Sequence, residues 1–202
     1  LQVTVESTDK STTETYTWTV EGKSEVYLSD LSYESNSASG WGNIMKDKSV
    51  DGNTMRLYDG TQEQTFEKGM GIHATGNLYY DIEGMGFKRF VTYMGVDREA
   101  NTDGNVKFNV YTDNTQVYTG DAVTRESAMK KLDISVEGVK MLRLNVDKNG
   151  SDSNDHADFA DAKFITELAD DTEPETVAVT GVTLDKSTAK LTEKGQTVDL
   201  TA

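Results

Sequence analysis

The stretch that decides the fold class is Val-Lys-Phe-Asn-Val-Tyr-Thr at residues 106–112, followed by the turn pair Asp113-Asn114 and a short run at 116–119. Val106, Phe108 and Val110 alternate with more polar residues, so they share one face of a β-strand. Asp and Asn are typical turn residues. The stretch therefore predicts an antiparallel β-hairpin with one buried face.

Similar runs recur on both sides of this hairpin. Residues 87–96 are strongly apolar, as expected of a central strand in a sandwich. Since no long stretch keeps a 3.6-residue period, we expect an all-β fold, either a β-sandwich or a jelly roll. Further strands are predicted at residues 1–5, 16–20, 26–31, 69–74, 77–82, 130–136, 141–146 and 160–168, with polar loops at 97–104 and 147–158.

The composition excludes several classes of function. The chain has 202 residues, with 20 Lys and Arg against 35 Asp and Glu, which gives a formal charge of −15. This acidity argues against a nucleic-acid or anionic membrane partner, because both attract a surplus of cations. The absence of cysteine excludes disulfides, thiolate metal sites and cysteine nucleophiles. No apolar run approaches the roughly 18 residues of a membrane helix.

Composition changes near residue 169. Residues 169–176 hold the only proline and four acids, which is typical of a solvated linker. Residues 177–202 begin a new strand pattern that is too short to fold alone. Residues 1–24 are expected to form a β segment of no clear assignment. The first residue is a leucine rather than Met, which indicates a fragment of a longer chain.

Three aromatic residues are candidates for binding. His73 lies in Gly-Met-Gly-Ile-His-Ala and His156 in Asn-Asp-His-Ala-Asp, at a predicted strand end and in a loop, where binding residues concentrate. Either histidine can instead be a structural hydrogen-bonding residue. Trp41 stands between two glycines. Its ring can stack on a sugar, or it can fold down and close one end of the sandwich.

The acidic loops suggest a metal, and the missing motifs argue against catalysis. Oxygen-rich loops at 51–54, 97–104 and 147–154 suit Ca²⁺, which takes about six to eight oxygen ligands. Any one of them can also be an ordinary solvated turn, and none has the EF-hand spacing. The sequence has no nucleophile elbow, Walker loop or His-Glu-x-x-His motif. We therefore expect that the chain is not an enzyme.

Five motifs follow one another in a fixed order. They are Val-Tyr-Leu-Ser-Asp-Leu at 26–31, Gly-Trp-Gly at 40–42, Lys-Asp-Lys-Ser-Val-Asp-Gly at 46–52, Lys-Gly-Met-Gly-Ile-His-Ala at 68–74 and Asp-His-Ala-Asp-Phe-Ala-Asp-Ala at 155–162. Over about residues 25–168 this set resembles the NPCBM domain, carbohydrate-binding module family 51. Residues 177–202 resemble the truncated start of a bacterial group 2 Ig-like domain, a spacer in multimodular surface proteins.

The resemblance implies a non-catalytic β-sandwich of the galactose-binding-like type. Its implied partners are galactose-containing glycans, such as galactose, N-acetylgalactosamine, mucin or blood-group structures. Such modules are covalently linked to secreted glycoside hydrolases or related surface proteins, so the implied location is extracellular or the bacterial cell surface. The alternative is a structural or adhesive spacer module without a sugar site.

The resemblance also implies positions for the ligands. A structural calcium is expected on Asp51 and Asn53, with Asp161 as a partner from the closing strand. The family usually has Trp where this chain has Phe159, which would alter affinity or specificity if that ring stacks on the sugar. The residues expected to contact the sugar are Trp41, His73, Asp97, Glu99, His156 and Asp158.

Overall fold

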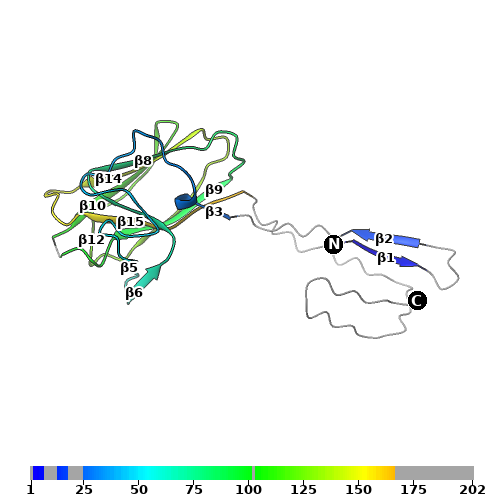
Figure 1. The fold of residues 1–202 in the computed structure, drawn as a ribbon, viewed down its shortest axis with the longest axis horizontal. Helices are drawn as coiled ribbons and strands as arrows, with labels where there is room; N and C mark the ends of the chain where they lie inside the picture. The colour runs from blue at the N-terminus through cyan, green and yellow to red at the C-terminus, as the bar shows by residue number, and fades with distance from the viewer. Residues whose placement is uncertain (1, 7–12, 18–24, 102, 167–202) are drawn as a thin grey trace. The chain divides into compact units, whose positions relative to one another are not determined.

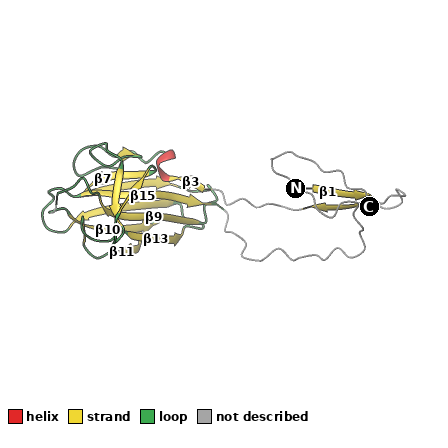
Figure 2. Ribbon diagram, turned by 90° about the horizontal axis from the view of Figure 1, so that it is seen from below, coloured by secondary structure: helices red, strands yellow, loops and turns green. Residues whose placement is uncertain are grey.

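The computed structural model describes residues 2–6, 13–17, 25–101 and 103–166, drawn in colour in Figure 1. Residues 25–166 lie in one unit, Lys23–Leu168, built from two antiparallel sheets that pack face to face (Figures 1 and 2). The prediction of an all-β sandwich is confirmed. Among the described residues, none forms a helix that is both long and apolar enough to cross a bilayer.

The first sheet has five strands in the order β11-β10-β14-β8, with β12 beside β10. The hairpin expected from residues 106–119 is its β10–β11 pair. Strand β8 alternates strictly between buried and more exposed residues, whereas β11 has no buried residue. The bounds are β8 (Gly76–Asp81), β10 (Asn105–Thr112), β11 (Thr115–Thr119), β12 (Val123–Thr124) and β14 (Met141–Lys148).

The second sheet has six strands in the order β13-β9-β15-β7-β4, with β3 beside β15. A separate hairpin, β5 (Met55–Tyr58) and β6 (Glu63–Phe66), adds a pair that the sequence did not predict. The bounds in the sheet are β3 (Glu25–Tyr27), β4 (Met45–Lys46), β7 (Gly69–His73), β9 (Arg89–Val96), β13 (Lys130–Ser135) and β15 (His156–Ile165).

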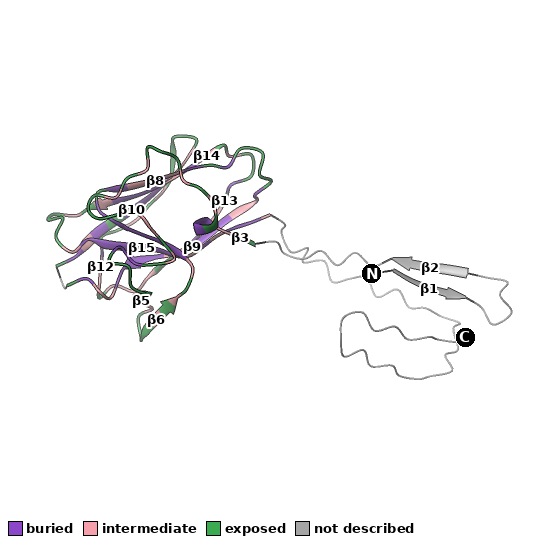
Figure 3. Ribbon diagram, in the orientation of Figure 1, coloured by how far each residue is buried: buried purple, intermediate pink, exposed green. Residues whose placement is uncertain are grey.

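The core lies between the two sheets, where buried residues line the inner faces (Figure 3). Phe159 of β15 meets Phe108 of β10 edge to face, with ring centroids 5.4 Å apart, and both side chains are almost fully buried. Aromatic side chains of this size carry much of the apolar area that stabilises such a core. Phe159 is therefore a core residue and not a sugar-stacking one.

The clearest differences from the predicted boundaries lie at two strands. Strand β15 begins at His156, whereas the sequence predicted a loop through residue 158, because His156 and Asp158 are polar residues on a covered face. Of the strand predicted at 26–31, only Val26 and Tyr27 belong to a strand, β3, and Leu28–Asp30 forms a 3-10 turn.

The described residues outside this unit form one hairpin, in which β1 (Gln2–Glu6) pairs antiparallel with β2 (Thr13–Thr17). Strands were predicted in this part of the sequence, at 1–5 and 16–20. The linker predicted at 169–176 and the Ig-like start predicted at 177–202 lie outside the described residues.

Candidate functional site

A depression of about 550 Å³ lies where β7 ends and β15 begins. Three aromatic rings meet there. His73 and His156 are direct partners in the β7–β15 register, and their ring centroids are 5.5 Å apart. The Trp41 ring lies 6.0 Å from His156 in a stacked arrangement and 5.8 Å from His73 edge to face. The structure thus brings together three of the predicted sugar-binding residues.

Hydrogen bonds of the loop fix the backbone at Trp41, while the residue itself is 58% exposed to solvent. The Ser39 hydroxyl accepts the N–H of His73 at 2.9 Å and donates to the Trp41 carbonyl at 2.5 Å. Gly40 donates its N–H to the His73 carbonyl, and a Cβ at this position would lie 2.2 Å from the Ala74 carbonyl oxygen. Only glycine fits so close an approach, so Gly40 fixes the loop that presents Trp41.

The His73 ring has a defined tautomer when neutral. Its Nδ1 lies 2.5 Å from the Ala74 carbonyl oxygen. A carbonyl only accepts hydrogen bonds, so Nδ1 carries the proton and Nε2 is an acceptor. The ring lines the depression and can accept a hydrogen bond there from a hydroxyl group.

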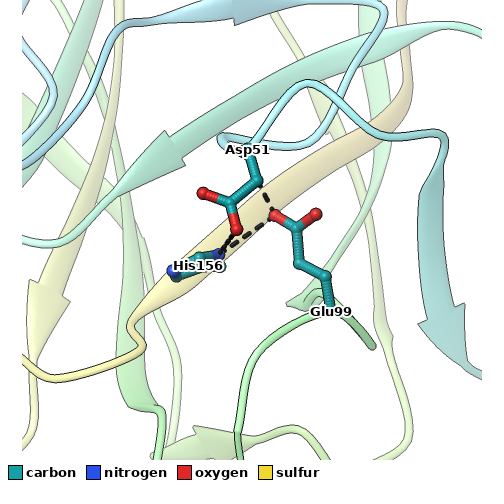
Figure 4. A group of neighbouring side chains, drawn as sticks. All are labelled: Asp51, Glu99 and His156. Atoms are coloured by element: carbon teal, nitrogen blue, oxygen red, sulfur yellow. Dashed lines mark hydrogen bonds and ion pairs between the residues drawn. The ribbon is translucent and has the colours of Figure 1, made fainter.

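The second histidine belongs to a charged cluster with Asp51 and Glu99 (Figure 4). His156 Nδ1 lies 3.0 Å from Glu99 Oε1 and 3.8 Å from Asp51 Oδ2. Burial alone would lower the pKa of His156, but the Glu99 hydrogen bond and the charges of Asp51, Glu99 and Asp97 raise it above its ordinary value. His156 therefore carries positive charge over a wider pH range than an isolated histidine.

Glu99 is the centre of this cluster, although it does not line the depression. Its Oε2 accepts hydrogen bonds from the Ser49 hydroxyl at 2.6 Å and the Asn53 amide at 2.8 Å, and its Oε1 accepts from His156 and from the N–H of Asp51. Burial alone would raise the pKa of Glu99, but these four donors lower it to about 2. Glu99 thus orients His156 and fastens the 49–53 turn.

Two further predicted sugar contacts lie beneath the surface. Asp97 and Asp158 are both 0% exposed, so neither can touch a ligand in the depression. Asp97 accepts the backbone N–H of Arg56 at Oδ2 and that of Glu99 at Oδ1. The prediction that these two carboxylates read sugar hydroxyls was wrong, because they face a covered side of β9 and β15.

The expected calcium ligands are not gathered in one place. Asp51 and Asn53 both contact Glu99, whereas Asp161 lies five residues beyond His156 on β15 and forms an ion pair with Lys163 at 3.2 Å. The Asn53 amide donates to Glu99, whose two oxygens already accept four hydrogen bonds. A calcium ion takes about six to eight oxygen ligands, so the protein groups among them must converge on one point. Asp51, Asn53 and Asp161 therefore do not fit a calcium site of that composition.

Several residues of the depression were not predicted as sugar contacts. Asp152, Ser153 and Asn154 form one wall, and Asp51 contributes to another. The sequence did mark 147–154 and 51–54 as loops rich in oxygen ligands, but that pattern suggested calcium. Polar loops of this kind can serve either ligand, and only the position of the loops beside Trp41 separates the two interpretations.

Residues 24–165 match the NPCBM/NEW2 domain family. The chain is 29% identical over 174 residues to a blood-group-substance endo-1,4-beta-galactosidase of Clostridium perfringens, covering 73% of this chain and 21% of the relative. It is 31% identical over 104 residues to alpha-1,3-galactosidase B of Akkermansia muciniphila, covering 50% of this chain and 13% of the relative. The chain thus spans only a small part, about a fifth or less, of the curated relatives that it matches.

Solved structures give the same assignment. A CBM51 from Clostridium perfringens GH95, solved in complex with methyl-galactose, is 36% identical with a TM-score of 0.67, covering 70% of this chain and 99% of that one. A Clostridium perfringens ZmpB structure with CBM51-2 in complex with GlcNAc is 32% identical with a TM-score of 0.67, covering 81% of this chain and 36% of that one. By sequence and by fold, this chain belongs to the NPCBM/NEW2 domain family.

Proposed function

We propose that this chain is a carbohydrate-binding module that recognises galactose-containing glycans. The observation that carries the proposal is the Trp41, His73 and His156 ring cluster in an open depression. An exposed indole face covers the apolar C–H face of a sugar, and nearby nitrogens and oxygens read its hydroxyl groups. The methyl-galactose complex of one similar CBM51 structure supports this ligand class, and the GlcNAc complex of another supports sugar binding more broadly.

Each wall of the depression has a different role in this recognition. Trp41 supplies the apolar face, and His73 Nε2 accepts a hydrogen bond. Asp51 and Asn154 offer a carboxylate and an amide from two different loops. Because the site is open and mostly polar, we expect modest affinity, roughly 10⁻³ to 10⁻⁵ M, which corresponds to about 4 to 7 kcal/mol.

The larger role follows from the relatives. Two of them are galactosidases by name, and the chain matches only a small part of each. We propose that the module holds a larger secreted or surface-attached glycoside hydrolase on mucin or blood-group glycans outside the cell. The family assignment agrees with the expectation that the chain itself is not an enzyme.

The burial of Phe159 weakens the alternative that the chain is a spacer module without a sugar site. Phe159, which stands where the family usually has Trp, is fully buried in the core. The change from Trp therefore does not remove a ring from the binding face, and it gives no reason to expect a lost sugar site.

A glycan array followed by calorimetry tests the proposal. The array holds galactose, N-acetylgalactosamine, GlcNAc, plant galactan and blood-group A, B and H glycans. We expect galactose-terminated hits, with methyl-galactose binding lost in His73→Ala and kept in Val117→Ala, an exposed residue on β11 outside the depression. A folded protein that binds no glycan, or one whose binding survives His73→Ala unchanged, would contradict the proposal.

A further inference from the structure

Asp158 is a buried acid without an evident donor. Its side chain is 0% exposed, and neither Oδ1 nor Oδ2 receives a hydrogen bond from a donor in the part of the chain that the structure describes. Yet it lies within hydrogen-bond reach of the Asp97 carboxyl. Two carboxylates cannot bond to each other, because both only accept. The contact requires a proton or a cation between them.

The surroundings of Asp158 are closed. On β15 it faces Gly71 of β7 and Gly95 of β9 in register, so all three share one face of the sheet. A Cβ on Gly71 would lie 2.4 Å from the Lys48 carbonyl oxygen and 2.8 Å from Ser49 Cα, and a Cβ on Gly95 would lie 3.0 Å from the Leu57 side chain. The 48–49 backbone and Leu57 thus cover this face and separate Asp158 from bulk solvent.

The two carboxyl groups are not equivalent. Asp97 has a backbone N–H donor at each oxygen, from Arg56 and from Glu99, at 2.8 Å and 2.7 Å. This arrangement stabilises a negative charge on Asp97. Among the described residues, Asp158 has no such donor. The asymmetry places the charge on Asp97 and the proton on Asp158.

We infer that Asp158 is a neutral carboxylic acid that donates a hydrogen bond to Asp97, and that this pair is a positioning element of the binding site. Burial, together with the charges of Asp97 and Glu99, raises the pKa of Asp158 well above its ordinary value. Of the other charged groups on this side, His156 lies two residues along the same face of β15 and Asp51 lies beyond it. The side chain of Lys48 is exposed.

The pair acts on the site through one chain of contacts. Asp158 holds Asp97, Asp97 holds the N–H of Glu99, and the Glu99 carboxylate holds His156 at 3.0 Å. Asp97 also fixes the backbone of Arg56 at the start of the β5–β6 hairpin. Loss of the buried pair should therefore change the position of His156, which lines the depression.

Conservative substitution of Asp158 distinguishes a proton from a cation between the two carboxyl groups. The amide introduced by Asp158→Asn has the shape of the neutral acid and an N–H for Asp97, so we expect a Tm at pH 7 equal to or above that of the wild type. Asp158→Ala removes the donor, and we expect a Tm lower by about 5 °C. Asp97→Asn is the matched control. It places an amide against backbone N–H groups, so we expect a loss of at least the same size.

The pH dependence gives a second readout. An acid whose folded pKa is raised is held protonated in the fold while the unfolded chain ionises. Folding is therefore progressively disfavoured as pH rises from about 4 toward the folded pKa. Relative to Asp158→Asn, the wild type should lose stability as pH rises above about 4, with the two curves converging near pH 4. The carbon-13 shift of the Asp158 carboxyl should report the acid form at pH 7.

Sugar affinity is a separate readout from stability and the carbon-13 shift. Methyl-galactose affinity should fall in Asp158→Ala and return in Asp158→Asn, and only this readout rests on the proposed function. A carboxylate shift for Asp158 at pH 7 in the wild type would overturn the inference. An Asp158→Asn variant that is as unstable as Asp97→Asn would also overturn it. So would a wild-type Tm that depends on calcium, if the Tm values of Asp158→Asn and Asp97→Asn do not. The stability and carbon-13 results stand even if no sugar binds.

Discussion

Replacing Glu99 by Gln removes the charge that holds the 49–53 turn and His156, with little change in shape. The lowering of its pKa from 4.5 to about 2 corresponds to about 3 kcal/mol in favour of the ionised side chain in the fold. The side chain is only 7% exposed, so solvent screening removes little of this. Gln retains one acceptor oxygen, and we therefore expect Glu99→Gln to lower the free energy of unfolding by about 2–3 kcal/mol at pH 6.

The pH profile should follow from the signs of the two shifts. Glu99 has a lowered pKa, so its contribution is present above about pH 4.5 and is lost as pH falls toward 2. His156 has a raised pKa, so its contribution is complete below about pH 6.5 and is lost as pH rises through the folded pKa. The ion pair, counted once, therefore stabilises most between about pH 4.5 and 6.5. The variant should therefore lack much of the loss of stability that the wild type shows below about pH 4.5 and above about pH 6.5.

Urea denaturation at pH 3, 6 and 9 measures the stability, and proton NMR of the His156 ring measures its pKa. In Glu99→Gln the His156 pKa should fall. Glu63→Gln is the matched control, because the Glu63 side chain is 41% exposed, pairs with Arg56 and Arg98, and is not a member of the cluster of Asp51, Glu99 and His156. An unchanged His156 pKa in Glu99→Gln, or a stability loss no larger than that of Glu63→Gln, would refute the reasoning.

Three further substitutions test the site and the core. Trp41→Ala should weaken methyl-galactose binding about tenfold without a change in Tm, because the sugar loses about 1.5 kcal/mol of apolar burial. Calorimetry measures this loss, and Met85→Ala, which changes a similarly exposed residue outside the depression, is the control. Phe159→Ala should lower the free energy of unfolding by about 3–5 kcal/mol while the folded protein binds sugar as before, measured by denaturation and calorimetry together. Gly40→Ala should lower both Tm and affinity, since its Cβ would meet the Ala74 carbonyl, and a normal affinity by calorimetry would speak against the close approach.

The fold could be predicted because its main signal is local. The alternation of Val106, Phe108 and Val110 with polar residues sets one face of β10, and the turn after it sets β11. The β5–β6 hairpin escaped prediction because each strand has only four residues and one of them, β6, carries no buried residue. A short strand without a clear apolar face gives little periodic signal.

The site could be predicted only in part. Trp41 was identified because a tryptophan between two glycines in a loop is unusual. The two histidines were identified because they lie at a predicted strand end and in a predicted loop, where binding residues concentrate. Asp97 and Asp158 were expected to contact the sugar because they lie in motifs that match the family, and a sequence motif does not report burial. Their burial depends on the Lys48–Ser49 backbone and Leu57 crossing Gly71 and Gly95, a tertiary contact that no local pattern encodes.

The register that pairs His73 with His156 has a consequence for how binding preference can change. Both polar anchors are fixed by the hydrogen-bonded ladder of a central sheet, whereas Trp41 and the 152–154 wall stand on loops. Exchange of a loop sequence leaves the ladder intact, so new sugar specificities can arise without loss of the anchors. Diversification within such a module then costs little stability, and the two histidines become its constant part.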